Sequence, residues 1–425
     1  MRKASLWQRL VGLERAVVED VEFDDELDVV VVHVRPVARA RRRCGHCGAR
    51  CPRYDQGAGR RRWRALDLGT TQAFLEADAP RVSCRRHGVV VAAVPWARHG
   101  AGHTRAFDDT VAWLACQVSK SAVRELMRIA WPTVGSILTR VSADIDASVD
   151  RLDGLVRIGI DEISYRRGQL FLTAVVNHNT GRLVWLGQGR SKATLEAFFD
   201  ELGPDRAKLI TEVTADAAAY IATVVAERAP QAVRCADPFH VVQWATHELD
   251  LVRRRIWNEA RDATGGRGRQ KQGRSQESAG DARKLQRSRY AMWKNPEDLT
   301  EKQKVKLDWI ARTKPELFRA YLLKEGLRTV FAVGGEDGIA GLKRWLAWAQ
   351  RCRIEEFVRL GRKVRRQLDA IHASLRLGLS NALLESTNTK IRLLTRIAYG
   401  FRKPESLMAL AMLALGGHRP DLPGR

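Results

Sequence analysis

Leu155-Val156-Arg157-Ile158-Gly159-Ile160-Asp161-Glu162 decides the fold, because an apolar run of strand length delivers a carboxylate at its end. Further strands are predicted over residues 169–176 and 182–186, separated by Asn177-His178-Asn179-Thr180-Gly181, a polar turn of residues that tolerate positive φ. This order of strand, hairpin and strand predicts a sheet whose first strand carries Asp161. An isolated Asp here more often only ends a strand, so the prediction depends on other carboxylates in the chain.

Two more aspartates follow predicted strands. Residues 208–214 form an apolar strand that leads to Asp216, which repeats the pattern of the opening stretch. Asp237 follows another short strand and opens a long helix, for which it is a suitable N-cap. His240 lies on the first turn of that helix, where a histidine is more often a structural hydrogen bonder than a catalytic base. We therefore expect Asp237 and His240 to support a site rather than to carry its chemistry.

Glu385 lies on a predicted helix that begins near Ser380, a good N-cap. The apolar residues of this helix recur at helical spacing: Leu384, Ile391 and Leu394. Asn388, Arg392 and Arg396 share a different face of the helix with Glu385. Lys390 adds a positive charge nearby. A carboxylate followed on the same side by arginines suits a metal site beside a phosphate backbone. We therefore expect Asn388, Lys390, Arg392 and Arg396 to contact DNA. The alternative is an exposed Glu paired with Lys390 or Arg392, which is common on surface helices.

The three carboxylates Asp161, Asp216 and Glu385 define a hard, all-oxygen site suited to Mg²⁺ or Mn²⁺. Phosphodiester chemistry commonly uses two such ions roughly 3.5–4 Å apart, one at the attacking oxygen and one at the leaving oxygen. We expect Asp161 to bridge both ions, with Asp216 and Glu385 each holding one. The strand order and the carboxylates together predict an α/β, RNase H-like catalytic domain. No Ser-His-Asp order and no phosphate-binding GxxxxGK[ST] stretch suggests another hydrolase class.

Composition favours a polyanionic partner. In 425 residues, enough for two or three domains, 73 Lys and Arg against 49 Asp and Glu give a net charge of +24 and a pI of about 10.3. A membrane surface is the competing polyanion. Apolar runs such as Val29–Val32 are too short to span a bilayer, and no N-terminal signal sequence is present, so we expect a cytoplasmic, nucleoid-associated protein.

Cysteine spacing predicts a zinc site near the N-terminus. Cys44 and Cys47 are separated by two residues in a glycine-containing knuckle, and Cys84 and His87 repeat that spacing. Seven cysteines, four of them between residues 44 and 84, suit metal binding in a reducing compartment better than disulfides. Cys51 is a spare thiol or an alternative ligand, and His46 is expected to face solvent. Unligated cysteines are the alternative.

A basic hairpin is predicted between the two ligand pairs. Residues 60–64 are Arg-Arg-Arg-Trp-Arg, and residues 71–79 alternate in polarity. We expect this zinc-ribbon-like module to touch the DNA backbone through Arg61, Arg62 and Arg64.

From Phe107 the apolar period becomes helical, with breaks near Ser119 and Pro132. Three short helices with these breaks match a helix-turn-helix, in which Pro132 lies at the first turn of the last helix. That helix would present Thr133, Ser136 and Arg140 to a DNA groove. A three-helix connector that packs on the next domain explains the same pattern.

A helical insertion is predicted to separate Asp216 from Glu385. Residues 265–280 are rich in Gly, Ser, Arg and Gln without apolar period, which predicts a flexible basic loop. Residues 281–377 are polar and helical, and we expect most of their tryptophans to lie in the core of the insertion.

These motifs together resemble a known family, the bacterial insertion-sequence transposases of the "ISL three" type, whose DDE catalytic domain is RNase H-like. The resemblance covers nearly the full chain. Its carriers are Trp63–Asp67, the Cys44/Cys47 knuckle, Ile158–Glu162, Asp216 with Tyr220-Ile221, Asp237–Val241, Ser380–Glu385 with Asn388 and Lys390, and Ala398–Arg402. The family's catalytic triad falls on Asp161, Asp216 and Glu385. His87 stands where the family usually has a fourth cysteine, which is a departure in the zinc module alone.

The resemblance implies a domain order and an activity. We expect a zinc module over 1–100, a helix-turn-helix over 101–150, a catalytic domain over 151–260 and 378–425, and the insertion over 261–377. The implied function is Mg²⁺-dependent DNA strand cleavage and strand transfer at terminal inverted repeats and target DNA, by at least a homodimer. The alternatives are a non-catalytic DNA-binding regulator derived from a transposase and a structure-selective nuclease on the same fold.

Overall fold

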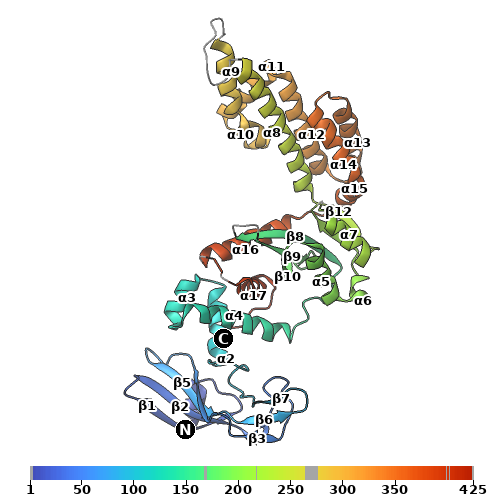
Figure 1. The fold of residues 1–425 in the computed structure, drawn as a ribbon. Helices are drawn as coiled ribbons and strands as arrows, with labels where there is room; N and C mark the ends of the chain where they lie inside the picture. Colours follow the sequence, from blue (N-terminus) through green and yellow to red (C-terminus); the bar gives the residue numbers. More distant parts are fainter. Residues whose placement is uncertain are drawn as a thin grey trace. The chain divides into compact units, whose positions relative to one another are not determined.

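The computed structural model describes residues 3–166, 170–216, 218–263, 276–398, 400–401 and 403–423 (Figure 1). Its contacts divide the chain into two units. The first unit comprises Met1–Arg151, Arg182–Leu186 and Thr389–Arg425, and the second comprises Leu152–Gly181 and Gly187–Asn388.

The first unit begins with a helix and two small sheets. Helix α1 (Lys3–Leu10) precedes a four-stranded sheet of order β1-β2-β5-β4, in which β2 and β5 are parallel. Alternate residues of β5 are buried, because successive side chains of a strand point to opposite faces. The antiparallel pairing of β4 and β5 confirms the predicted hairpin. The strands are β1 (Ala16–Asp24), β2 (Val29–Pro36), β4 (Arg60–Arg64) and β5 (Gln72–Asp78), and the second sheet is β3 (Arg53–Asp55), β6 (Arg81–Cys84) and β7 (Gly88–Val91).

Three helices follow in this unit at the predicted breaks. They are α2 (Arg105–Ala115), α3 (Lys120–Met127) and α4 (Trp131–Asp146). Thr104 and Ser119 cap α2 and α3 by accepting hydrogen bonds from backbone N–H groups, and Pro132 lies in the first turn of α4. Helix α17 (Pro404–Leu415) packs against α4. The three helices thus belong to a small core of their own.

A mixed sheet has the order β10-β9-β8-β11-β12, and its strands other than β10 lie in the second unit. β8 and β9 form the predicted antiparallel hairpin, and β11 is parallel to both β8 and β12. Helices α5 (Lys192–Leu202), α6 (Pro204–Ala207) and α7 (Ala219–Arg228) connect the strands. The strands are β8 (Arg157–Arg166), β9 (Leu170–Asn177), β10 (Arg182–Gln188), β11 (Glu212–Ala215) and β12 (Val233–Ala236).

The first strand is longer than predicted. β8 continues to Arg166, so Asp161 lies inside the strand and not at its end. The extension is stabilised by pairing of Glu162 with Thr173 and of Ser164 with Phe171 on β9. Gln169, predicted as the start of the next strand, falls outside the described residues.

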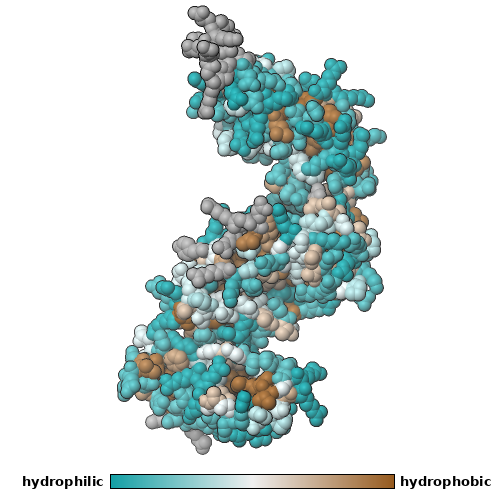
Figure 2. Space-filling model, viewed as in Figure 1, coloured by the Kyte–Doolittle hydropathy of each residue, from teal (hydrophilic) through white to brown (hydrophobic). Residues whose placement is uncertain are grey.

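A helical insertion follows β12 and has a large core of its own. It comprises α8 (Pro238–Ala263), α9 (Gln276–Gln286), α10 (Arg289–Trp293), α11 (Glu301–Thr313), α12 (Pro315–Val333), α13 (Gly335–Arg351), α14 (Glu355–Arg366) and α15 (Leu368–Leu377). Trp345 is buried in this core and donates to the Leu323 carbonyl at 2.7 Å, whereas Trp348 is 39% exposed. Most of the predicted flexible loop, residues 264–275, lies outside the described residues, and 276–280 begin α9. Figure 2 shows a mainly hydrophilic surface over the insertion, broken by small apolar patches.

Helix α16 (Ala382–Ile397) carries Glu385 and lies against the sheet at Gly159. A Cβ at Gly159 would lie 2.6 Å from Leu384 Cδ1, 2.8 Å from His178 Nε2 and 3.0 Å from Thr214 Oγ1. The glycine of the opening stretch is therefore what allows this helix to approach the strand. Among the helices of the described residues, none is long and apolar enough to cross a bilayer.

We expect Gly159→Ala to destabilise the protein by about 1–3 kcal/mol, because the added methyl group overpacks the contact with Leu384. Urea unfolding of the two proteins measures this difference. Gly102→Ala is the matched control, since a Cβ there meets nothing within 4 Å, and its stability should stay within about 0.5 kcal/mol of the parent. Equal destabilisation by both substitutions would contradict the close approach.

Candidate active site and zinc centre

Asp161 and Asp216 follow adjacent positions of two parallel strands. Ile160 of β8 pairs with Ala215 of β11, so Asp161 inside β8 and Asp216 directly after β11 lie at neighbouring positions of the sheet. Asp161 accepts a hydrogen bond from its neighbour Glu162 N at 2.8 Å and another from Asn388 Nδ2 at 2.6 Å. Burial raises the pKa of Asp161, and the charge of Asp216 acts in the same direction. The register thus sets two carboxylates within electrostatic reach of each other.

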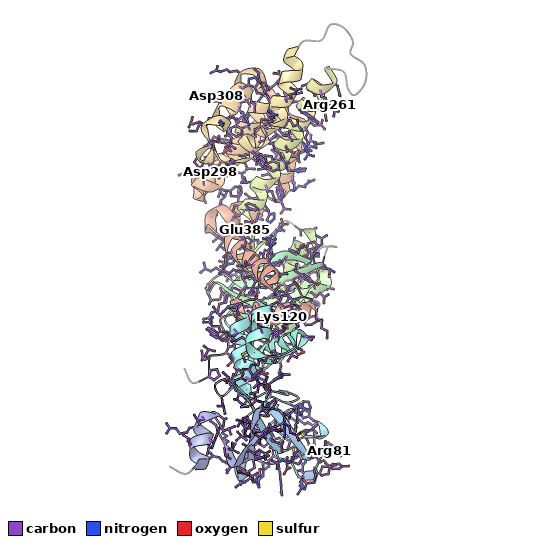
Figure 3. The ribbon with its side chains drawn as sticks, turned by 90° about the vertical axis from the view of Figure 1, so that its left-hand side faces the viewer. Arg81, Lys120, Arg261, Asp298, Asp308 and Glu385 are labelled. Carbon is purple, nitrogen blue, oxygen red and sulfur yellow. The ribbon has the colours of Figure 1, made fainter. Side chains whose placement is uncertain are left out.

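Glu385 lies in the first turn of α16 (Figure 3). Burial raises the pKa of Glu385, with further contributions from the charges of Asp237 and Asp161. Its Oε1 atom is buried and has no hydrogen-bond partner within the described residues. Leu384 is fully buried, which fixes the position of this turn against the sheet.

Asp237 adds a fourth carboxylate, and His240 lies between it and Asp216. Asp237 is 2% exposed, and its Oδ1 accepts from Phe239 N and Asn381 N, each at 3.3 Å. The first of these contacts is the capping interaction expected from the sequence. His240 Nε2 lies 3.7 Å from Asp237 Oδ2, and His240 Nδ1 lies 3.8 Å from Asp216 Oδ1. Burial raises the pKa of Asp237, while the facing His240 lowers it.

Buried polar atoms without partners gather around these residues. Within the part of the chain that the structure describes, they are Asp237 Oδ2, both polar side-chain atoms of Asn381, Glu385 Oε1 and Asn388 Oδ1. Buried oxygens without a donor are costly unless another group, such as a cation, satisfies them. The oxygen donors therefore fit Mg²⁺ or Mn²⁺. Among the described residues, no three carboxylates have oxygens all within 4.8 Å of one another.

Asn388 has a different environment from the one predicted. The sequence placed it among DNA-contacting residues, but its side chain is buried at 3% exposure and donates to Asp161. Its position one helical turn after Glu385 was the available signal, since residues three apart share a helix face. Sequence reasoning assigned no role to Asn381, whose backbone N–H donates to Asp237 and thereby connects the start of α16 to the acidic cluster.

The four predicted zinc ligands come together in the first unit. Cys44, Cys47, Cys84 and His87 place one ligand atom each within 4.8 Å of all the others. Cys47 Sγ lies 3.8 Å from Cys84 Sγ, and His87 Nδ1 lies 3.5 Å from Cys44 Sγ and 3.6 Å from Cys84 Sγ. Tetrahedral zinc at about 2.3 Å from sulfur and about 2.0–2.1 Å from nitrogen sets sulfurs roughly 3.8 Å apart and sulfur and nitrogen roughly 3.5 Å apart. The ligand geometry is that of a tetrahedral Cys₃His site.

Local backbone geometry supports this site. Each ligand pair is followed by a glycine at positive φ, Gly48 at 68° and Gly88 at 65°, which lets the chain turn back after the second ligand. Backbone N–H groups of Arg86 and His87 lower the pKa of Cys84 to about 6, which favours the thiolate that binds metal. Cys51 is buried beside the cluster, but its thiol donates to the Ala49 carbonyl at 3.3 Å. Cys51 is therefore outside the ligand set.

The predicted DNA-contacting arginines of β4 already have protein partners. Arg64 is 7% exposed and pairs with Asp67 at 2.5 Å, so it is a structural residue and the prediction for it needs correction. Arg61 donates to the Ala101 carbonyl at 2.6 Å, and Arg62 pairs with Glu76 at 2.7 Å. The partners of Arg61 and Arg62 come from distant segments, which strand periodicity alone does not reveal.

The three residues of α4 that were predicted to enter a DNA groove also differ in their environments. Arg140 makes two hydrogen bonds, at 2.9 and 3.1 Å, with the fully buried Asp108 of α2. This pair stabilises the packing of α4 on α2, so we leave Arg140 out of the proposed DNA contacts. Ser136 is exposed and Thr133 half-buried on the same helix.

The remaining predicted DNA contacts lie on the C-terminal part of α16. Lys390, Arg392 and Arg396 are exposed, and within the described residues none of them forms an ion pair.

Comparison with known proteins identifies the class of this protein. Residues 158–411 match a domain family described as "Transposase" (DDE_Tnp_ISL3), residues 92–142 match "Helix-turn-helix domain of transposase family ISL3", and residues 40–87 match "zinc-finger of transposase IS204/IS1001/IS1096/IS1165". The first match covers more than half of the chain, including Asp161, Asp216 and Glu385.

Relatives of the same length agree with these domain matches. The chain is 59% identical over 436 residues to "Transposase for insertion sequence element IS1557" of Mycobacterium tuberculosis, which covers 100% of this chain and 98% of the relative. It is 26% identical to "Transposase for insertion sequence element IS1001" of Bordetella parapertussis, covering 98% of this chain and 100% of the relative. The chain belongs to the ISL3 family of insertion-sequence transposases. The predicted family, α/β RNase H-like fold class and transposase function are confirmed, and nothing supports the regulator alternative.

Proposed function

We propose that this transposase cleaves DNA at the ends of an insertion sequence and joins the freed 3′-OH to target DNA in a reaction that requires Mg²⁺ or Mn²⁺. In this proposal Asp161, Asp216 and Glu385 hold the ions. The observation that carries it is the acidic cluster, in which the charge of Asp216 raises the pKa of Asp161 and the charge of Asp161 raises the pKa of Glu385, while buried oxygens lack hydrogen-bond partners within the described residues. Concentrating negative charge beside DNA disfavours binding alone, so a cation-dependent reaction explains the cluster better than a binding role.

Other residues of the site orient the carboxylates that are proposed to hold the ions. Asn388 fixes the Asp161 carboxylate by donating to Oδ2, and the Asn381 N–H fixes Asp237. His240 offers one ring nitrogen toward Asp216 and the other toward Asp237, so it sets the distance between them. Bound divalent ions would stabilise the charge on the attacking and leaving oxygens. Cleavage breaks a phosphodiester bond with water and frees a 3′-OH, and joining exchanges one phosphodiester for another.

DNA recognition and assembly complete the proposal. The zinc ribbon and the helix-turn-helix bind the terminal inverted repeats, with Ser136 and Thr133 of α4 facing the groove. Lys390, Arg392 and Arg396 contribute contacts to the DNA backbone. Two paired element ends require two active sites, so we propose at least a homodimer. A nucleoid-associated location follows from the substrate and stays a prediction.

The test is to incubate the purified protein and Mg²⁺ with labelled element ends and supercoiled target DNA. We expect end cleavage and covalently joined products, which denaturing gels resolve. Joined products separate this function from a structure-selective nuclease, which would cut branched DNA without joining it. Binding of the ends with neither cleavage nor joining would refute the proposal.

We expect Asn388→Ala to lower the cleavage rate about 10- to 100-fold and to raise the Mg²⁺ concentration needed for half-maximal activity, because Asp161 loses the partner that orients it. Cleavage measured over a Mg²⁺ titration checks both effects. Ser386→Ala, an exposed substitution on the same helix, is the matched control and should change neither quantity. An unchanged Mg²⁺ dependence in Asn388→Ala would contradict the orienting role.

A further inference from the structure

An exposed aromatic ring lies beside the acidic cluster and is not part of a hydrophobic core. Phe239 is 55% exposed although it comes between Asp237 and His240. Its ring meets the His240 ring edge to face, with centroids 5.8 Å apart. A phenylalanine with more than half of its surface in water at such a place offers a flat apolar face to whatever enters the site.

His240, which the Phe239 ring contacts, shares a face of α8 with Trp244, a residue that packs partly buried against the core of the insertion. Trp244 lies one turn after His240, at the i+4 position that shares a helix face. Lys363 of α14 places its Nζ 3.7 Å from the centre of the Trp244 ring. Burial lowers the pKa of Lys363, and the charges of Asp216 and Glu248 raise it. Lys363 thus connects α14 to the face of α8 that carries His240 and Trp244.

Helix α14 continues from Lys363 as a basic stripe. Arg362 and Arg366 are exposed and lie on the same side of the helix as Lys363. Within the described residues neither arginine has an acidic partner. Other arginines of the insertion are paired: Arg255 with Glu316 and Glu356, Arg328 with Glu297, and Arg376 with Glu336. Arg362 and Arg366 are thus exposed cations of α14 that are free to meet an anionic partner.

We propose that Phe239, Trp244, Lys363, Arg362 and Arg366 form a binding track for an unpaired stretch of the DNA strand that is processed at the site. The proposal rests on the proposed function, because it assumes that the acidic cluster receives a DNA strand. Phe239 stacks on a base, and the stripe on α14 holds the phosphates that follow. Arginine and lysine supply the charge, and the aromatic face supplies contacts that every base can make regardless of sequence.

An unpaired strand fits these residues better than a duplex. The bases of a duplex are stacked on one another and cannot also stack on Phe239, whereas the arginines would meet the backbone of either form. Stacking on Phe239 therefore distinguishes an unpaired strand from a duplex, whereas the basic stripe alone would bind both.

Binding of two fluorescent DNAs to the full-length protein, without added Mg²⁺, tests the track. One is a blunt duplex of arbitrary sequence, and the other is the same duplex with six unpaired nucleotides at one 3′ end. We expect the extended DNA to bind about tenfold more tightly, and Phe239→Ala to remove this preference while leaving affinity for the blunt duplex unchanged. Phe239→Trp should retain the preference, because it keeps a stacking surface. Tyr290→Ala, which removes an aromatic 64% exposed elsewhere in the insertion, is the control.

The basic stripe is tested through salt dependence. Arg362→Gln with Arg366→Gln should weaken binding of the extended DNA and lower the slope of log affinity against log salt by about 1.4, which is two single-strand phosphate contacts. Lys302→Gln with Arg312→Gln removes the same charge from exposed positions on α11 and should not change the slope for the unpaired extension.

Equal binding of both DNAs by the parent protein, or an undiminished preference in Phe239→Ala, would overturn the inference. Cleavage and joining by the parent protein would then still support the proposed function. A preference that depends on Phe239 in a protein that joins no DNA ends would keep the track and refute the proposed reaction.

Discussion

Asp161→Asn is expected to lower DNA cleavage and joining by about 10³-fold or more while binding of the element ends is retained. Asp161 is the carboxylate proposed to bridge both ions, and it is the one that Asn388 and the Glu162 N–H hold in place. An amide in its place keeps one of the two acceptor oxygens, loses the other and carries no negative charge to hold a cation. Metal stabilisation of the reacting oxygens is worth several kcal/mol, and each 1.36 kcal/mol is a factor of ten in rate. Single-turnover cleavage of labelled ends measures the loss.

The matched control for this substitution is Glu162→Gln on the same strand. Glu162 points to the other face of the sheet, where it accepts a hydrogen bond from Tyr220. Removing its charge should leave the cleavage rate within about tenfold of the parent. Comparable losses in the two variants would mean that strand damage, rather than the carboxylate at 161, limits the reaction, and full activity of Asp161→Asn would refute the assigned site.

The strands and the carboxylates were accessible to sequence reasoning because their signals are local. The apolar run Leu155–Ile160 leads into and begins β8, which starts at Arg157, and Glu385 falls one turn into a helix with a suitable start. The register of β8 and β11 then brings Asp161 and Asp216 to neighbouring positions, a consequence of parallel pairing that follows from the predicted order of elements.

The hydrogen-bond and ion-pair partners of individual side chains could not be predicted from the sequence. Arg64, Arg140 and Asn388 were all expected to contact DNA, and each instead binds a carboxylate that lies on another element or in a loop. A sequence pattern specifies which face of an element a residue occupies, but the choice between solvent and a buried acidic partner depends on tertiary packing. A strongly basic composition made the DNA assignment attractive for every arginine, although several of them serve the fold.

Chelation of zinc, or Cys84→Ser, is expected to unfold the zinc ribbon and to abolish binding of element ends. The core around this site consists of Cys44, Cys51, Val82 and Cys84, with Val90 and Ala92 packed against it, which is too little apolar surface to hold three short strands. In small zinc-finger peptides the metal contributes about 10–16 kcal/mol of apparent binding free energy, and that energy is folding energy. Metal content, limited proteolysis of the first hundred residues and binding of element ends measure the three consequences.

Two substitutions separate a metal ligand from a packed thiol at this site. Cys51→Ala removes a buried sulfur that donates to a backbone carbonyl, so it should keep one zinc per chain and cost only about 1 kcal/mol of stability. His87→Cys keeps four ligands and should also retain zinc, because a thiolate at this position meets the same tetrahedral requirement. If Cys84→Ser kept stoichiometric zinc and Cys51→Ala lost it, the ligand set would be Cys44, Cys47, Cys51 and His87. The distances of 3.5 to 3.8 Å among the present four argue against that outcome, since they already equal the edges of a zinc tetrahedron.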